Sequence, residues 1–76
     1  MIIEPVKEKG KSRYNIIEID RGKNVGLIAN YDSLEQAAMV MRYLKGAYMP
    51  NGDQKAALRL IFQWDVRQHM KESAEK

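Results

Sequence analysis

Residues 14–46 read YNIIEIDRGKNVGLIANYDSLEQAAMVMRYLKG and carry the plainest secondary-structure signals in the chain. Residues 14–20 and 25–31 are rich in aliphatic and tyrosine side chains that suit a pleated sheet, which favours two strands. Between them lie Gly22 and Asn24, and both residue types tolerate the positive φ of a tight turn. The stretch therefore predicts an antiparallel hairpin against which the flanking segments pack.

The alternation of side chains along these two strands assigns each residue to one of two sheet faces. Apolar groups occur on both faces of residues 14–20, which is typical of a central strand. We assign five apolar side chains to the buried face: Ile17, Ile19, Val25, Leu27 and Ala29. The outer face then carries Tyr14, Ile16, Glu18 and Ile28.

A helix is predicted directly after the hairpin. Asp32 is placed to cap the free N–H groups of its first turn, and Glu35 stands three residues later, as in a capping box. The helix is expected to run to Lys45 and to stop at Gly46. Apolar residues at helical spacing predict its inner stripe: Leu34, Ala37, Ala38, Met41 and Leu44.

A first strand is predicted over residues 2–7. It should lie at a sheet edge, because Pro5 cannot donate a ladder hydrogen bond. Residues 7–13, with Gly10 in the middle, read as a loop or as the tip of a wide hairpin. We predict one α+β domain over residues 1–76, in which a small antiparallel sheet of two or three strands is followed by two packed helices.

The second helix is predicted from Asp53, its cap, to about Lys71, and residues 71–76 are expected to fray. The first six of its apolar residues cover an arc of roughly 200°, wider than one core contact needs. They are Ala57, Leu58, Leu60, Ile61, Phe62 and Trp64, followed by Val66 and Met70. The surplus part of this arc allows a homodimer as one reading of the chain.

Composition bears on where the protein works. The chain has no cysteine, so it can form neither a disulfide nor a thiolate metal site, which fits a reducing compartment. Its N-terminus lacks the basic region and long apolar run of a signal peptide. No apolar stretch approaches the roughly 20 residues that span a bilayer. We expect a cytoplasmic protein without a membrane partner.

Catalytic chemistry is not predicted. The single histidine, His69, has no cluster of further ligands from which a metal site could be built. Gly10, Lys11 and Ser12 imitate the end of a phosphate-binding loop, but Pro5 occupies the position where that motif needs its first glycine. We therefore expect no enzyme activity, no cofactor and no metal.

The predicted outer sheet face is the first candidate for partner binding. It combines apolar with basic side chains and comprises Arg13, Tyr14, Ile16, Glu18, Arg21, Lys23 and Ile28. If both helices pack on one side of the sheet, this strip is exposed and suits a protein partner or a DNA groove. If a helix covers it, its apolar members belong to the core.

A second candidate surface combines the inter-helix loop with the second helix, at Tyr43, Tyr48, Met49, Phe62 and Val66. The competing interpretation is that these side chains seal a small core, as apolar residues at helical spacing usually do. We expect a non-enzymatic protein-binding module, with a double-stranded DNA-binding module as the alternative.

The hairpin followed by a capped helix resembles the sheet-reading DNA-binding domains of phage integrases and plant AP2-type factors. Arg13, Tyr14, Lys23 and the strand-to-helix junction at residues 31–37 carry the resemblance. It implies a sheet that enters the major groove with the helix packed behind it. Glu18 would oppose phosphate binding there.

The chain also resembles a small phage anti-CRISPR protein of nearly the same length that has a sheet followed by two helices. The shared letters are Gly22-Lys23, Val25-Gly26, Asp32-Ser33 and Glu35-Gln36. The resemblance implies a phage or mobile-element inhibitor that occupies a protein subunit of an RNA-guided nucleoprotein complex. Tyr14, Ile16 and Glu18 would be its natural contacts.

Overall fold

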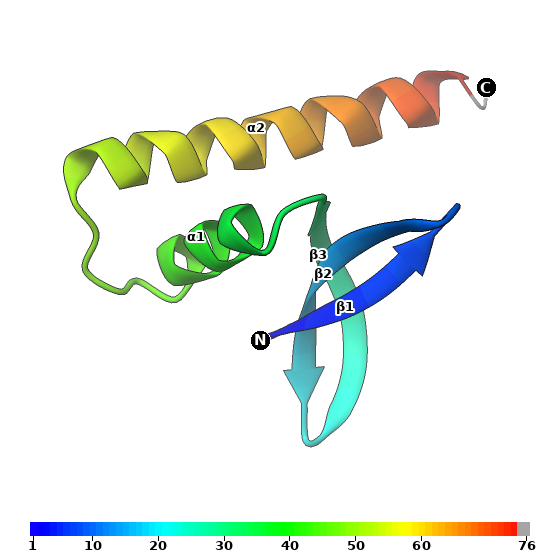
Figure 1. The fold of residues 1–76 in the computed structure, drawn as a ribbon, viewed down its shortest axis with the longest axis horizontal. Coiled ribbons are helices and arrows are strands. Elements are labelled where there is room, and N and C mark those ends of the chain that lie inside the picture. Colours follow the sequence, from blue (N-terminus) through cyan, green and yellow to red (C-terminus); the bar gives the residue numbers. More distant parts are fainter. Residues whose placement is uncertain (75–76) are drawn as a thin grey trace.

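A computed structural model describes residues 1–74 and shows a three-stranded antiparallel sheet followed by two helices (Figure 1). The elements are β1 (Ile2–Glu8), β2 (Lys11–Asp20), β3 (Lys23–Tyr31), α1 (Leu34–Leu44) and α2 (Asn51–Ala74). The strand order is β1-β2-β3, which leaves β2 in the centre and Pro5 on an edge strand. The predicted α+β class is therefore confirmed.

Both hairpins close through two-residue turns. Lys9 and Gly10 have φ values of 52° and 79°, and Arg21 and Gly22 have values of 52° and 78°. Two central residues with positive φ define the turn whose twist matches that of the flanking strands, and glycine adopts this conformation without steric cost. Of the two readings of residues 7–13, the hairpin tip is therefore confirmed and the loop was wrong, because the turn is confined to Lys9 and Gly10 and the rest of the segment lies in β1 and β2.

Two register shifts divide β3 into parts that face opposite sides of the sheet. Ile16 pairs with Ala29, but Ile17 pairs with Leu27, so Ile28 is an extra residue between the two pairs. Such a bulge breaks the alternation of side chains. The predicted buried face was therefore wrong for Leu27, which is 54% exposed.

The second shift has the same effect further along β3. Glu18 pairs with Gly26 and Ile19 with Asn24, which leaves Val25 as the extra residue. Val25 is 58% exposed and does not belong to the buried face that was predicted for it. Ile17 is buried and Ile19 is half-buried, so the prediction is confirmed for Ile17 and only partly met by Ile19.

The core lies between the sheet and α1. Ile16, Ala29 and Tyr31 contribute the sheet side of one buried cluster, and Ala37 and Val40 contribute the helix side. The predicted inner stripe of α1 is confirmed for Ala37. It was wrong for its two ends, Leu34 and Leu44, which are exposed, and it omitted Val40.

The ends of α1 explain why it starts and stops where it does. The Ser33 hydroxyl accepts a hydrogen bond from the backbone N–H of Gln36 at 3.5 Å, so Ser33 is the cap and Asp32 is not. At the other end Gly46 has a φ of 75°, its N–H donates to the Tyr43 carbonyl, and the Ala47 N–H donates to the Arg42 carbonyl. These two bonds form a Schellman motif and confirm the predicted stop.

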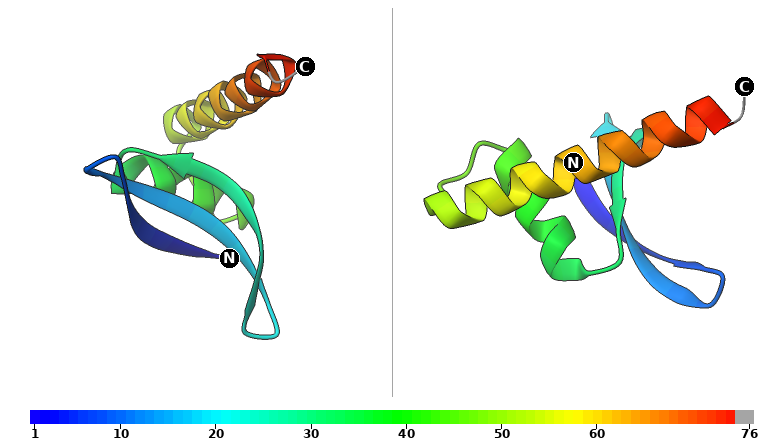
Figure 2. Two further views of the ribbon diagram at one scale, coloured as in Figure 1. Left: turned by 90° about the vertical axis from the view of Figure 1, so that its right-hand side faces the viewer. Right: turned by 90° about the horizontal axis from the view of Figure 1, so that it is seen from above.

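α2 packs on α1 and on β3 and continues well past α1 (Figure 2). Ala57 is buried, and Leu60, Ile61 and Trp64 pack against the core cluster. The helix begins at Asn51, two residues before the predicted cap, and extends to Ala74. The remainder of the predicted frayed tail, residues 75–76, lies outside the described residues.

Candidate functional site

The apolar members of the predicted sheet-face site point into the fold. Ile16 is fully buried, and Tyr14 and Ile28 are half-buried and pack against the core cluster. The reason is that α1 covers the sheet face on which Ile16 and Ala29 lie. An open apolar strip around Ile16, as predicted, therefore does not form.

The charged members of the same predicted site are spread along the hairpin. Arg13 lies near the start of β2, whereas Arg21 and Lys23 lie at the turn that joins β2 to β3. Figure 1 shows this turn at the end of the sheet remote from α2. Glu18 is exposed. The structure therefore brings neither the basic nor the apolar members together into one surface.

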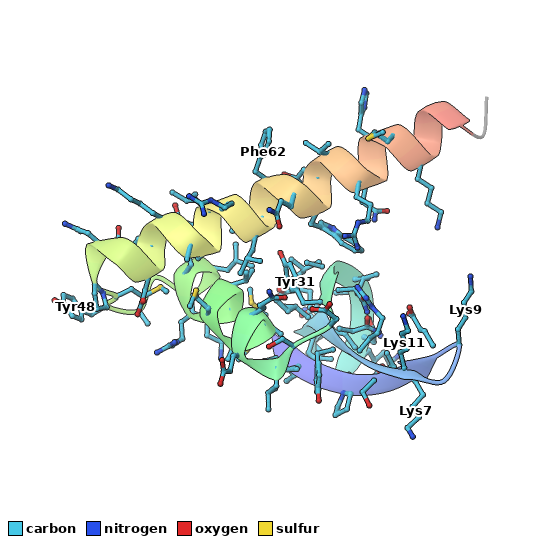
Figure 3. The ribbon with its side chains drawn as sticks, turned by 45° about the horizontal axis from the view of Figure 1, so that its top comes forward. Lys7, Lys9, Lys11, Tyr31, Tyr48 and Phe62 are labelled. Carbon is cyan, nitrogen blue, oxygen red and sulfur yellow. The ribbon has the colours of Figure 1, made fainter. Side chains whose placement is uncertain are left out.

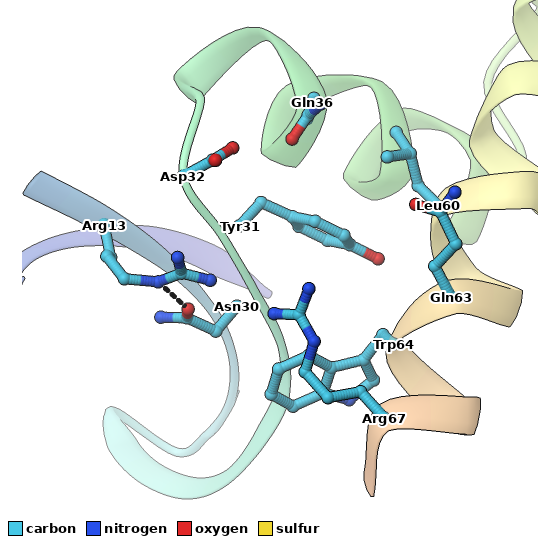
Figure 4. Close-up of a pocket in the computed structure, with 9 residues that line it drawn as sticks. All are labelled: Arg13, Asn30, Tyr31, Asp32, Gln36, Leu60, Gln63, Trp64 and Arg67. Atoms are coloured by element: carbon cyan, nitrogen blue, oxygen red, sulfur yellow. Dashed lines mark hydrogen bonds between the residues drawn. The ribbon is translucent and has the colours of Figure 1, made fainter.

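A basic groove lies instead between the sheet and the C-terminal half of α2. It consists of an inner hollow of about 160 Å³ and an outer one of about 540 Å³, which share Arg13, Asn30, Trp64 and Arg67. The inner hollow is further lined by Tyr31, Asp32, Gln36, Leu60 and Gln63 (Figure 4). The outer hollow is further lined by Glu8, Lys9, Lys11, Asn15, Leu27, Gln68 and Lys71.

Three polar side chains connect the strands on the sheet side of this groove. Asn15 and Asn30 are paired across β2 and β3, and the Asn30 amide nitrogen donates to the Asn15 side-chain oxygen. Arg13 Nε donates to the side-chain oxygen of Asn30 and lies 3.8 Å from a Glu8 carboxylate oxygen. Asn30 is only 7% exposed, so these bonds satisfy a buried amide and hold Arg13 at the wall of the groove.

The groove is electropositive. Its lining contains five basic residues and two acidic ones. Among the side chains that the structure describes, residues 1–71, there is one ion pair, between Glu8 and Arg13. Lys9, Lys11, Arg67 and Lys71 thus form no ion pair with a described carboxylate, and their charges add to a positive field in a concave site.

Tyr31 supplies an unusual polar group to the inner hollow. Its side chain is only 6% exposed, and its hydroxyl has no hydrogen-bond partner among the described residues. Figure 4 shows the hydroxyl pointing toward α2, on the side of the groove occupied by Leu60 and Gln63. Burial raises the pKa of Tyr31, and the negative charge of Asp65 raises it further. The hydroxyl therefore stays protonated and is shielded from solvent.

Tyr31→Phe is expected to leave the free energy of unfolding at pH 7 unchanged or to raise it by about 1 kcal/mol, because it removes a buried hydroxyl that has no partner. A raised pKa means that, above pH 10, the unfolded chain releases the Tyr31 proton while the folded protein retains it. The free energy of unfolding of the wild type therefore falls as the pH rises above 10. The contribution of Tyr31 to this fall is absent from Tyr31→Phe. Urea unfolding from pH 7 to about pH 11 measures both effects. A clear destabilisation at pH 7 would show that the hydroxyl has a stabilising partner.

A second surface lies on the opposite side of α2. Leu58, Phe62, Val66 and Met70 recur every four residues and are 48%, 67%, 39% and 66% exposed. Figure 3 shows Phe62 pointing away from the rest of the fold, whereas Tyr31 lies between α2 and the sheet. We call these four residues the outer stripe. They are the surplus part of the apolar arc predicted for this helix.

The structure separates the other members of the second predicted surface. Met49 is buried, whereas Tyr48 is 92% exposed in the loop between the helices. Tyr43 is half-buried on α1. Of that predicted set, only Phe62 and Val66 share a surface, and they do so as part of the outer stripe.

Two further observations concern the described residues alone. Among them, no group of three or more His, Asp or Glu side chains is placed to hold a metal ion. Neither α1 nor α2 is long and apolar enough to cross a membrane.

The fold is that of a small α+β protein in which a three-stranded antiparallel meander precedes two helices. No protein-family model, curated protein or solved structure matches the chain. The resemblances to sheet-reading DNA-binding domains and to a phage anti-CRISPR protein therefore stay predictions. The function has to be argued from the groove and the outer stripe.

Proposed function

We propose that the protein is a non-enzymatic protein-binding module that docks another protein on the outer stripe of α2. The observation that carries the proposal is the row of four large apolar side chains, each at least 39% exposed, on one side of one helix. Single exposed apolar residues are common, but a contiguous row of them marks an interaction surface. Phe62, the central aromatic residue, is the expected anchor.

The stripe is not needed to hold the fold together. The opposite side of α2 already supplies Ala57, Leu60, Ile61 and Trp64 to the packing against α1 and the sheet. A helix that is apolar on two sides needs a second contact, since water contact with its outer side chains is unfavourable. We assign this second contact, at the outer stripe, to the partner protein.

The charges around the stripe indicate the chemistry of that partner. Lys55 and Arg59 lie seven residues before Phe62 and Val66 and so share their side of the helix. Arg67 lines the same hollow as Phe62 and Met70. Asp65 lies seven residues after Leu58 and, by the same spacing, is the one acidic residue on this side among residues 51–71 apart from Asp53 in the first turn. The rim is therefore mainly basic, and it favours an apolar surface bordered by acidic residues over a second copy with the same basic rim.

Binding of this kind acts by occupying a surface of the partner. A protein subunit of a bacterial nucleoprotein complex is the first partner class to test, in keeping with the resemblance to a phage inhibitor. The proposal moves the expected contact from the sheet face, where Ile16 is buried, to α2.

The test compares two Leu→Ser substitutions at similar exposure. Leu58 belongs to the outer stripe and is 48% exposed, whereas Leu34 starts α1 and is 53% exposed. Purified wild-type protein, Leu58→Ser, Phe62→Ser and Leu34→Ser are each used as bait, and the affinity of each captured protein is then measured by calorimetry. We expect Phe62→Ser to weaken direct binding by about tenfold or more, Leu58→Ser to weaken it less, and Leu34→Ser to leave it unchanged.

Two results would contradict the proposal. If Leu58→Ser and Leu34→Ser weakened binding of the captured protein equally, that protein would recognise exposed leucines in general and not the outer stripe. A concentration-dependent dimer in light scattering that Phe62→Ser converts to a monomer would show that the stripe binds a second copy. Circular dichroism melts of all variants check that the fold is intact.

A further inference from the structure

We propose that the basic groove is a binding site for single-stranded nucleic acid. The groove lies on the side of α2 that faces the sheet, and Arg67 borders both the groove and the hollow beside the outer stripe. The inference does not depend on the protein-binding function proposed above. It rests on three features of the groove: basic side chains on both walls, an aromatic and amide lining, and a concave shape that admits one strand.

Basic side chains come from both walls. The β1–β2 hairpin supplies Lys9, Lys11 and Arg13, and the last turns of α2 supply Arg67 and Lys71. Figure 3 shows Lys9 and Lys11 on the α2 side of the hairpin and Lys7 on the other side. Two facing rows of cations can contact consecutive phosphates of a strand that runs between them, and release of the condensed counterions then favours binding.

The interior of the groove supplies groups that suit bases and sugars. Trp64 lines both hollows and offers an aromatic ring on which a base can stack. The half-buried Asn15 lines the outer hollow with an amide group, whereas the Asn30 amide is buried and bonded to Arg13 and Asn15. A base or sugar in the outer hollow can therefore stack on Trp64 and exchange hydrogen bonds with Asn15.

The shape of the groove favours a single strand over a duplex. The cations line hollows of about 160 and 540 Å³ between the sheet and α2. Duplex readers insert a helix or a strand ribbon into the major groove. In this protein the basic residues line a concavity, so a narrow ligand such as a single strand fits it better than a duplex does.

The protein contains one tryptophan, so its fluorescence reports on the groove directly. We expect an unlabelled thymidine oligomer of about 12 nucleotides to quench the Trp64 emission. With up to five phosphate contacts, the slope of log K against log salt is about −3.5, and affinity falls about a hundredfold between roughly 50 and 200 mM salt. A duplex of the same length should bind much more weakly.

Matched charge variants separate the groove from general attraction. Lys11→Gln/Lys71→Gln removes one cation from each wall, whereas Lys7→Gln/Lys45→Gln removes the same charge from exposed positions outside the groove. We expect the groove pair to lower affinity by about tenfold and to reduce the salt slope by about 1.4. The control pair should change affinity by no more than about twofold.

Three outcomes would overturn the inference: equal losses from the two double variants, binding without any change in Trp64 emission, or tighter binding of the duplex. Phe62→Ser separates this inference from the proposed function, because its side chain points away from the groove (Figure 3). If Phe62→Ser abolishes protein capture and leaves oligomer binding unchanged, both proposals stand. If the oligomer fails to bind while capture depends on Phe62, the groove inference alone falls.

Discussion

Ile16→Asp is expected to unfold the protein. Ile16 is fully buried, pairs with Ile3 on one side and Ala29 on the other, and belongs to the central cluster with Val40 of α1. A carboxylate at this position would lose its hydration without gaining a partner, which costs several kcal/mol. A domain of this size has only about 4–11 kcal/mol of stability in total. Far-ultraviolet circular dichroism and a urea melt should show a largely unfolded chain at 25 °C.

The control is Leu27→Asp on the neighbouring strand. Leu27 is 54% exposed, because the bulge at Ile28 turns it away from the cluster, and its replacement should change stability by less than about 1 kcal/mol. A folded Ile16→Asp variant with a normal melting temperature would mean that Ile16 faces solvent. The register of β2 against β3 would then have to be different.

The contrast between Ile16 and Leu27 also shows which parts of the fold could be predicted from the sequence and which could not. The hairpin, its turn, the edge position of Pro5 and both helices followed from local signals. The inward face of the hairpin did not, because strict alternation places Leu27 and Ala29 on one side. A bulge is one extra residue, and the twist and packing of the whole sheet select its position. None of the residue types at positions 25–29 predicts the position of the bulge.

The cap of α1 shows a smaller ambiguity of the same kind. Asp32 and Ser33 are both good caps, and each is followed three residues later by a residue that suits a capping box, Glu35 or Gln36. Local chemistry therefore leaves two registers one residue apart. Packing decides between them, because the Ser33 register turns Ala37 and Val40 toward the sheet.

The two proposed binding surfaces differ in how far they can be predicted from the sequence. The outer stripe was visible as a surplus of apolar residues on one helix, although only the contact with α1 and β3 shows which part of the arc faces inward. The basic groove joins residues 9–15 to residues 64–71, which no periodic pattern connects. The one local signal was the pair Asn15 and Asn30, two amides at facing positions of the β2–β3 hairpin.

Asn30→Ala is expected to cost about 2–3 kcal/mol, the largest effect of any polar substitution that we consider. Asn30 accepts from Arg13 and donates to Asn15, and at 7% exposure little water can replace either bond. The variant leaves two half-buried polar side chains without their partner. Urea unfolding of Asn30→Ala against wild type measures the cost.

Asn24→Ala on the same strand is the matched control for Asn30→Ala. The Asn24 side chain accepts one exposed bond from the Gly26 N–H at 3.0 Å, so its loss should cost less than about 0.5 kcal/mol. Equal costs for the two variants would contradict the buried network. Because Asn30 also fixes Arg13 at the groove wall, Asn30→Ala should weaken oligomer binding even under conditions where the protein is fully folded, whereas Asn24→Ala should not. The same buried amide therefore links the stability of the sheet to the geometry of the groove.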